Sequence, residues 1–207
     1  MQANDRNDID KSSAHLIHNG SRQLFRYWEA LRAERPCPVR TDVEMAKLAP
    51  VLPHITIMQK SELATWEFRL AGTKVCELLQ KQVTGQDALQ GFDTFERDVI
   101  GKAFNLAADR LQPALVRMRL MYSGAHVLAA EMLVLPVWDS ASHKVQLLGG
   151  LFSFKGENDH PTGLLQRREL VSARVIWTEH EHGDNLLEQV GRSAPLTLRV
   201  IQGGLSR

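Results

Sequence analysis

Three strand-like segments between residues 116 and 154, joined by very short turns, constrain the fold of this chain most strongly. In the first segment, apolar and basic residues alternate with the period of two that is typical of a strand with one buried face. Its apolar positions are Val116, Met118, Leu120 and Tyr122. Residues 127–137 and 145–154 form the next two segments. Strands joined by such short turns pair as antiparallel neighbours, so the chain is predicted to contain an antiparallel sheet.

Two more predicted strands and two helices stand before these segments. Residues 55–60 and 66–70 have the composition or the alternation of strands. Helices are expected over residues 73–79 and 94–111, each opened by a threonine that can cap it. The apolar positions expected on the longer helix are Phe95, Val99, Ala103, Leu106 and Ala107, widened by Ile100 and Phe104. This order predicts an α+β fold, with a five-stranded antiparallel sheet and helices inserted between its second and third strands.

The segment SRQLFRYWEALRAERPCPVR, residues 21–40, predicts an amphipathic helix that stops at two prolines. The apolar face of this helix consists of Leu24, Phe25, Trp28 and Leu31. A helix with this much aromatic surface needs another surface to cover it. Two partners are open at this point: the core of the same domain, or a second subunit.

The runs LFRYWEALRAERPCPVR, LAPVLPHITIM and FRLAGTKVCELL together carry a family resemblance. In this combination the chain resembles the PAS-like proteins common in alphaproteobacteria, over about residues 20–155. The resemblance implies a PAS-like domain over residues 20–155 that includes the N-terminal helix. Residues 1–19 are then expected to form a flexible tail, and residues 156–207 a linker and a short C-terminal extension.

In PAS proteins the sheet and the helices often enclose a cavity, and an N-terminal helix commonly forms a dimer seam. The resemblance therefore makes Leu24, Phe25, Trp28 and Leu31 candidates for a dimer or partner interface. The candidates for a cavity lining are Trp66, Phe68, Leu70, Phe104, Met118, Leu120, Met132, Val134 and Phe152. The alternative is that these nine residues are simply core.

Known PAS cofactors are not expected here. Haem-binding relatives use a histidine on the long helix as the iron ligand, and residues 94–111 contain none. Flavin photosensors need a reactive cysteine in an Asn-Cys-Arg type motif, and Cys76 lacks those neighbours. No cofactor is therefore predicted, whereas an unidentified small organic ligand remains open.

The stretch EHEHGD, residues 179–184, concentrates residue types that bind metals. His180 and His182 lie two apart and could share one face of a strand to bind zinc or nickel. The alternative is an exposed polar loop, because the spacing matches no standard structural zinc pattern.

Composition narrows the classes of function. The net charge of +1 gives no electrostatic case for nucleic acid or for an anionic membrane, and the N-terminus has no apolar signal core. The longest apolar stretch is too short to span a bilayer. Together with these limits, the PAS-like resemblance and the apolar face of the N-terminal helix imply a cytoplasmic, non-enzymatic regulatory protein that works through protein contacts with an unidentified partner, as a homodimer. The alternatives are a small-molecule sensor with a cavity, and a metal-dependent hydrolase that uses residues 179–184.

Overall fold

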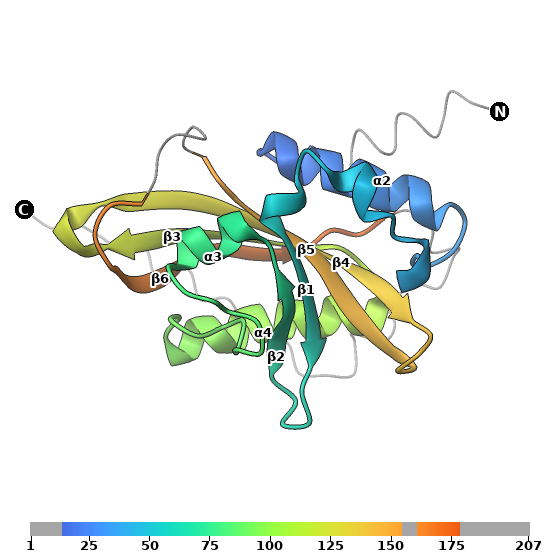
Figure 1. The fold of residues 1–207 in the computed structure, drawn as a ribbon. Helices are drawn as coiled ribbons and strands as arrows, with labels where there is room; N and C mark the ends of the chain where they lie inside the picture. Colours follow the sequence, from blue (N-terminus) through green and yellow to red (C-terminus); the bar gives the residue numbers. More distant parts are fainter. Residues whose placement is uncertain (1–13, 155–160, 179–207) are drawn as a thin grey trace, which may run out of the picture.

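The computed structural model describes residues 14–154 and 161–178. Six antiparallel strands form one sheet in the order β2-β1-β5-β4-β3-β6, with helix α2 on one face and helices α3 and α4 on the other (Figure 1). The strands are β1 (Ile55–Lys60), β2 (Trp66–Ala71), β3 (Ala114–Tyr122), β4 (Val127–Asp139), β5 (Lys144–Ser153) and β6 (Leu165–Val175). The helices are α2 (Asn19–Arg32), α3 (Thr73–Leu79) and α4 (Thr94–Arg110). The predicted α+β class is confirmed.

Strand β4 shows why the centre of the sheet is apolar on both faces. Alternate β4 side chains join two separate core clusters. Those facing α3 and α4 are Leu128, Ala130, Met132 and Val134. Those facing α2 are Leu133, Leu135 and Val137. A strand covered on both faces reads in the sequence as a nearly continuous apolar run.

Strand β6 corrects the predicted five-stranded sheet. It pairs with the full length of β3, from Ala114 opposite Val175 to Tyr122 opposite Leu165. Residues 165–175, expected in a linker and extension, are therefore part of the sheet. The physical reason is that β3 would otherwise be an edge strand, whose free N–H and C=O groups take up a further strand. Two parts of the predicted linker and extension, residues 156–160 and 179–207, lie outside the described residues.

The residues just before α2 are fixed to the sheet. Leu16 has no exposed surface, and the backbone N–H groups of Ile17 and His18 donate hydrogen bonds of 3.2 and 3.1 Å to Glu131. The prediction of a flexible tail over residues 1–19 is therefore wrong for residues 14–19, the last of which begins α2. Residues 1–13 lie outside the described part of the chain.

Helix α4 begins with a capping box that also sets its orientation. The side chains of Asp93 and Glu96 each accept a hydrogen bond of 2.9 Å from the other's backbone N–H. Glu96 is turned inward and accepts a second bond of 2.9 Å from the N–H of Leu170 in β6. Phe95 consequently faces outward and is 75% exposed, so its predicted place on the buried face is wrong.

Candidate functional site

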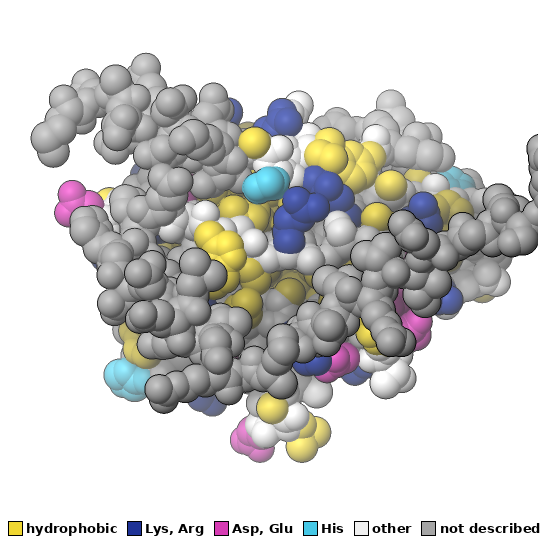
Figure 2. All heavy atoms as spheres, turned by 180° about the vertical axis from the view of Figure 1, so that it is seen from behind, with side chains coloured by type: hydrophobic (Ala, Val, Ile, Leu, Met, Phe, Trp, Pro, Cys, Tyr) yellow, Lys and Arg dark blue, Asp and Glu magenta, His cyan; other side chains and the backbone are white. Residues whose placement is uncertain are grey.

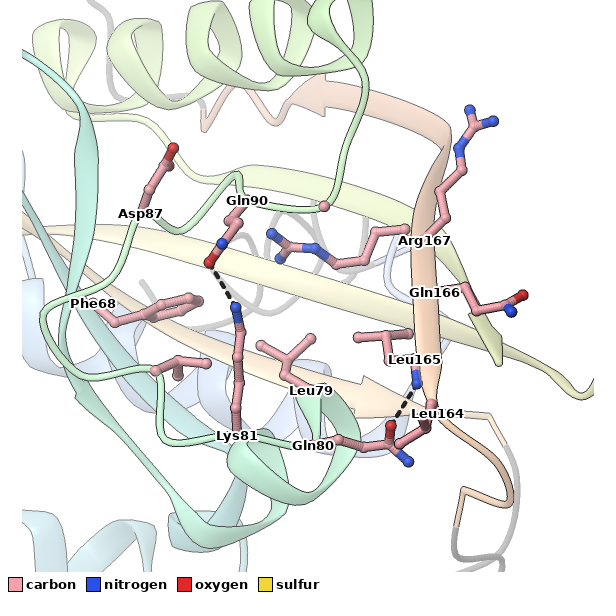
Figure 3. A pocket seen from close by; sticks show the side chains of 13 residues that line it. Phe68, Leu79, Gln80, Lys81, Asp87, Gln90, Leu164, Leu165, Gln166 and Arg167 are labelled. Carbon is pink, nitrogen blue, oxygen red and sulfur yellow. Dashed lines mark hydrogen bonds between the residues drawn. The ribbon is translucent and has the colours of Figure 1, made fainter. Parts of the chain in front are cut away.

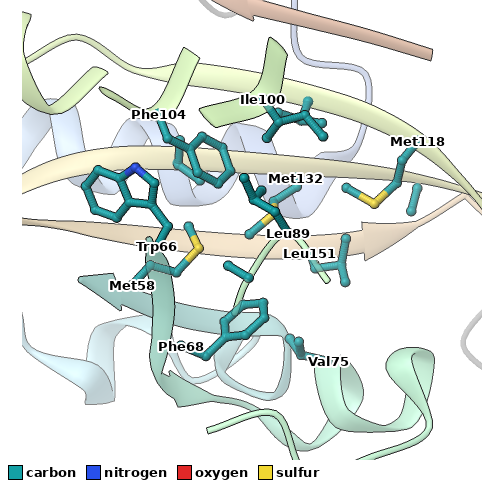
Figure 4. Close-up of a cluster of buried hydrophobic side chains, with 14 of the residues drawn as sticks. Met58, Trp66, Phe68, Val75, Leu89, Ile100, Phe104, Met118, Met132 and Leu151 are labelled. Atoms are coloured by element: carbon teal, nitrogen blue, oxygen red, sulfur yellow. The ribbon is translucent and has the colours of Figure 1, made fainter. Parts of the chain in front are cut away.

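Seven of the nine predicted cavity residues lie in one buried cluster between the sheet and helices α3 and α4. They are Trp66, Phe68, Phe104, Met118, Leu120, Met132 and Val134. In Figure 4 the labelled members of this group come from strands and from α4 and turn toward a shared interior. Trp66 and Phe104 pack edge to face, with ring centroids 6.2 Å apart. These seven residues are core side chains that fill the space between sheet and helices.

The other two predicted lining residues do not face this cluster. Leu70 lies on edge strand β2 and is 40% exposed. Phe152 lies on the opposite sheet face, where its ring stacks between those of His18 and His54 at centroid distances of 4.8 and 5.1 Å. Strand alternation turned Phe152 to the α2 side, so its predicted place in a cavity beside α4 is wrong.

The predicted interface on α2 is occupied within the same chain. Leu24, Phe25 and Trp28 have no exposed surface, and Leu31 packs at the margin of the same cluster. The indole Nε1 of Trp28 donates a hydrogen bond of 2.8 Å to the carbonyl of Pro136 in β4. The sheet therefore covers this apolar face, and these three buried side chains are not available to a second subunit as predicted.

A pocket of about 390 Å³ opens at the margin of the α3/α4-side cluster, between the segment after α3 and strand β6 (Figure 3). Its apolar lining consists of Phe68, Leu79, Val83, Leu164 and Leu165. Its polar and charged lining includes Gln80, Lys81, Asp87, Gln90, Arg167 and Arg168. Only Phe68 among the predicted cavity residues lines this pocket. It is a candidate binding site, because apolar walls meet a few polar groups there and one of these, Arg168, is buried.

The pocket lies where one connecting segment holds together two edge strands that are not neighbours in the sheet. On one side, the N–H groups of Gly85 and Ala88 each donate a 2.7 Å bond to a β2 carbonyl. On the other side, the N–H of Arg168 in β6 donates to the carbonyl of Gly91 at 2.9 Å. Gly91 has a φ of +92°, a backbone region that favours glycine. The side chain of Gln80 also bonds to β6, accepting from the N–H of Leu165.

Arg168 is the most unusual group in the pocket wall. It is only 5% exposed, although it carries a charge. Its Nη1 donates to the carbonyl of Ala88 at 3.0 Å, and the guanidinium lies 4.4 Å from the ring centroid of Phe92. Within residues 14–154 and 161–178, no carboxylate forms an ion pair with it. Burial lowers the pKa of Arg168 to about 10, against a smaller opposing effect of Asp87.

The family model for the PAS domain matches residues 16–152. The chain belongs to the PAS domain family. Membership indicates a sensory or signalling role. No curated protein matches this sequence.

The α2-side face of this PAS domain contains a buried carboxylate that alternation alone would direct outward. Glu131 has no exposed surface and also accepts a 3.2 Å hydrogen bond from Nε of Arg117. Nη2 of Arg117 donates to the carbonyl of His15 at 2.6 Å. Glu131 and Arg117 therefore hold the segment before α2 against the sheet. Two other arginines on the strands, Arg69 and Arg119, are instead exposed to solvent.

Sequence reasoning missed the pocket because five of its thirteen lining residues lie in the segment expected to form a linker and C-terminal extension. One signal was present: in the run QRREL, Arg168 stands two residues before Leu170 and so faces the same side of a strand. An arginine on an apolar strand face is the kind of residue that marks a site. The contribution of Lys81 and Gln90 had no comparable signal, because the segment between α3 and α4 has no periodic pattern.

The metal-binding prediction falls on His180 and His182, which lie outside the described residues. Within the described part of the chain, no group of three or more histidine, cysteine, aspartate and glutamate side chains is placed to hold a metal ion. No helix that the structure describes is both long and apolar enough to cross a membrane.

Proposed function

We propose that this PAS domain is a regulatory sensor that binds a small molecule in the pocket beside β6. In this proposal it catalyses no reaction and passes its signal on by contact with another protein. The observation that carries the proposal is the buried Arg168 in the wall of a pocket with apolar sides. The volume of about 390 Å³ falls within the range of roughly 300–1,000 Å³ typical of small-molecule sites.

The position of the pocket supports a role in signalling. A bound molecule would touch Lys81 on the connecting segment and Arg168 on β6, on the two sides of the joint between sheet edges. A ligand that binds one arrangement of this joint better than another shifts the population toward that arrangement. The ends of β2 and β6 are the parts whose relative placement would change, and a partner protein can read such a change.

Native mass spectrometry of the untagged protein, beside a denatured spectrum, tests whether a small molecule copurifies. A thermal-shift screen of metabolites follows, with two variants. Gln90→Trp places a large side chain in the pocket, and Gln23→Trp makes the same change on the exposed side of α2. We expect the copurified mass or the ligand-induced shift to be lost in Gln90→Trp and kept in Gln23→Trp. Failure of every compound to bind, or equal binding by both variants, contradicts the proposal.

A homodimer is the second candidate, and exposed apolar side chains favour it. Val127, Phe154 and Val171 are 37%, 40% and 53% exposed. The described surface seen in Figure 2 shows hydrophobic side chains beside basic ones. A contiguous exposed apolar patch commonly marks a protein contact, and the dimer proposal is that these three side chains belong to one. This interface would replace the one predicted on α2, whose apolar residues are buried.

Sedimentation velocity over a range of concentrations tests the dimer. Val127→Asp introduces a charge on β4, and Leu63→Asp makes the same change in the exposed turn between β1 and β2. The expected result is a dimer that Val127→Asp dissociates and Leu63→Asp does not. A monomer at every concentration rules out the homodimer.

A further inference from the structure

The charges that line the pocket are unevenly compensated. Asp87 forms an ion pair with Arg97, which stands outside the lining. Arg167 lies 3.3 Å from carboxylate oxygens of both Asp93 and Glu96. These two lining residues are therefore already neutralised by their neighbours.

The two remaining charged groups of the lining, Lys81 and Arg168, form hydrogen bonds only to neutral groups within the described residues, although Asp87 has a smaller electrostatic effect on Arg168. Nζ of Lys81 donates to the amide oxygen of Gln90 at 2.6 Å (Figure 3). Arg168 donates to the carbonyl of Ala88 and stacks on Phe92. The pocket therefore presents two cationic groups that form no ion pair within the described residues, and one of them is buried.

Burial of a cation without an anion is energetically unfavourable. The guanidinium loses most of its hydration, and a carbonyl together with an aromatic ring returns only part of that energy. The lowered pKa of Arg168 has the same cause, because desolvation disfavours the charged form. An anion that enters the pocket would provide the missing charged partner for Arg168. Because this site is buried, the electrostatic attraction would be stronger there than at the exposed surface.

We propose that the pocket binds a small organic carboxylate. The carboxylate would pair with the guanidinium of Arg168 and interact with Lys81, while the apolar part of the ligand lies against Phe68, Leu79 and Leu165. This inference rests on the proposed sensor function and names the chemical class of its ligand.

The lining favours a carboxylate over a phosphate ester. A planar guanidinium matches the two oxygens of a carboxylate in a bidentate pair. A phosphate dianion would need a second buried cation, whereas Lys81 lies at the exposed side of the pocket. The apolar walls also require an organic body, which an inorganic anion lacks.

Isothermal titration at low salt tests this assignment with matched probes. The panel contains linear, branched and aromatic carboxylates, the amide and the alcohol of each skeleton, and inorganic phosphate. We expect at least one carboxylate to bind, and its amide, its alcohol and phosphate to bind at least tenfold more weakly.

Arg168→Gln should weaken carboxylate binding by roughly 10- to 100-fold, since the lost bond involves two charged groups. Arg26→Gln, an exposed change on α2, should leave binding unchanged.

Two further measurements cover the case in which Arg168→Gln fails to fold. Lys81→Gln changes an exposed side chain and should weaken binding by about two- to fivefold. In the unmodified protein, the Nε–H resonance of Arg168 should shift on addition of a binding carboxylate and not of its amide. Arg168→Lys, which retains the charge but not the forked donors, identifies this resonance.

The outcomes separate the two proposals. Binding of neutral or cationic compounds in the pocket, with no preference for carboxylates, overturns the ligand class and leaves the sensor function standing. Equal binding of phosphate overturns the assignment of an organic carboxylate. Unchanged carboxylate affinity in folded Arg168→Gln removes Arg168 from recognition. If no compound of any charge binds, both proposals fail.

Discussion

The backbone N–H of His18 donates a 3.1 Å hydrogen bond to a side-chain oxygen of Glu131, 113 residues later in the chain. Glu131 stands in the middle of β4 and has no exposed surface. This bond, together with those from Ile17 and Arg117, satisfies a carboxylate that would be costly to bury alone. The start of α2 is therefore fixed to the sheet by a polar contact as well as by its apolar face.

Replacement of Glu131 by alanine should destabilise the protein strongly. The change leaves two backbone N–H groups and the guanidinium of Arg117 without their acceptor, and we expect a loss of about 3 kcal/mol in the free energy of unfolding. Urea denaturation measures this loss. Hydrogen exchange should show faster opening of residues 17–25 than of α4. Glu169→Ala, which removes an exposed ion pair with Arg119, should cost about 1 kcal/mol or less. Similar losses in both variants would contradict the anchoring role of Glu131.

Substitutions at Trp28 should act on stability and not on subunit association. Trp28→Ala removes a fully buried indole, and we expect a loss of about 3–5 kcal/mol. Trp28→Phe retains most of the packing but loses the bond to the carbonyl of Pro136, at a cost of about 1–3 kcal/mol. Chemical denaturation gives both values. Sedimentation of the folded Phe variant should match that of the unmodified protein, and a changed association constant would restore the interface predicted on α2.

The α2 residues show what the sequence could and could not predict. Their spacing correctly identified the apolar face of the helix. It could not choose between the two partners, because both would bury the same residues. The same limit applies to β6, whose pairing partner β3 lies about 50 residues earlier, since pairing between distant segments leaves no local pattern.

Glu131 and Phe95 mark a second limit. The sequence pattern correctly assigned Glu131 to a strand, but it could not show that the side chain is buried. That burial depends on hydrogen bonds from the backbone N–H groups of residues 17 and 18. Phe95 was expected inside because it is apolar. The capping box and the bond to Leu170 instead direct Glu96 inward. Polar contacts between distant segments decide both positions, and hydrophobic patterns do not contain them.

Acidification should weaken the fold through His18. Its Nδ1 accepts a 3.0 Å hydrogen bond from the N–H of Gly20 and so caps α2. Burial lowers the pKa of His18, as does nearby His54, against an opposing effect of Glu131. Between this lowered pKa and the unfolded value of 6.5, the unfolded chain binds a proton that the folded one does not. The free energy of unfolding should therefore fall as the pH drops below 6.5.

Urea midpoints measured between about pH 7.5 and pH 5 test this dependence. His18→Asn retains a capping acceptor without a titrating group, and it should flatten the profile. His143→Asn changes an exposed turn residue and should leave the profile as it is. An unchanged slope in His18→Asn would assign the pH dependence to other groups.

Two glycine-to-alanine changes should have opposite signs. A Cβ at Gly20 would overlap the ring of Phe152, which is confined between His18 and His54. We expect Gly20→Ala to destabilise the protein by about 1–3 kcal/mol, because the ring has little room to move.

Gly101 lies within α4, where the nearest atom to an added Cβ is in Leu89, at 3.6 Å. Gly101→Ala should stabilise by about 0.5–1 kcal/mol, since alanine has the higher helix propensity. Thermal unfolding of the pair measures the difference. An unchanged melting temperature in Gly20→Ala would show that the stacked rings of His18, Phe152 and His54 can move to admit the methyl group. In that case α2 is held mainly by Glu131 and Trp28.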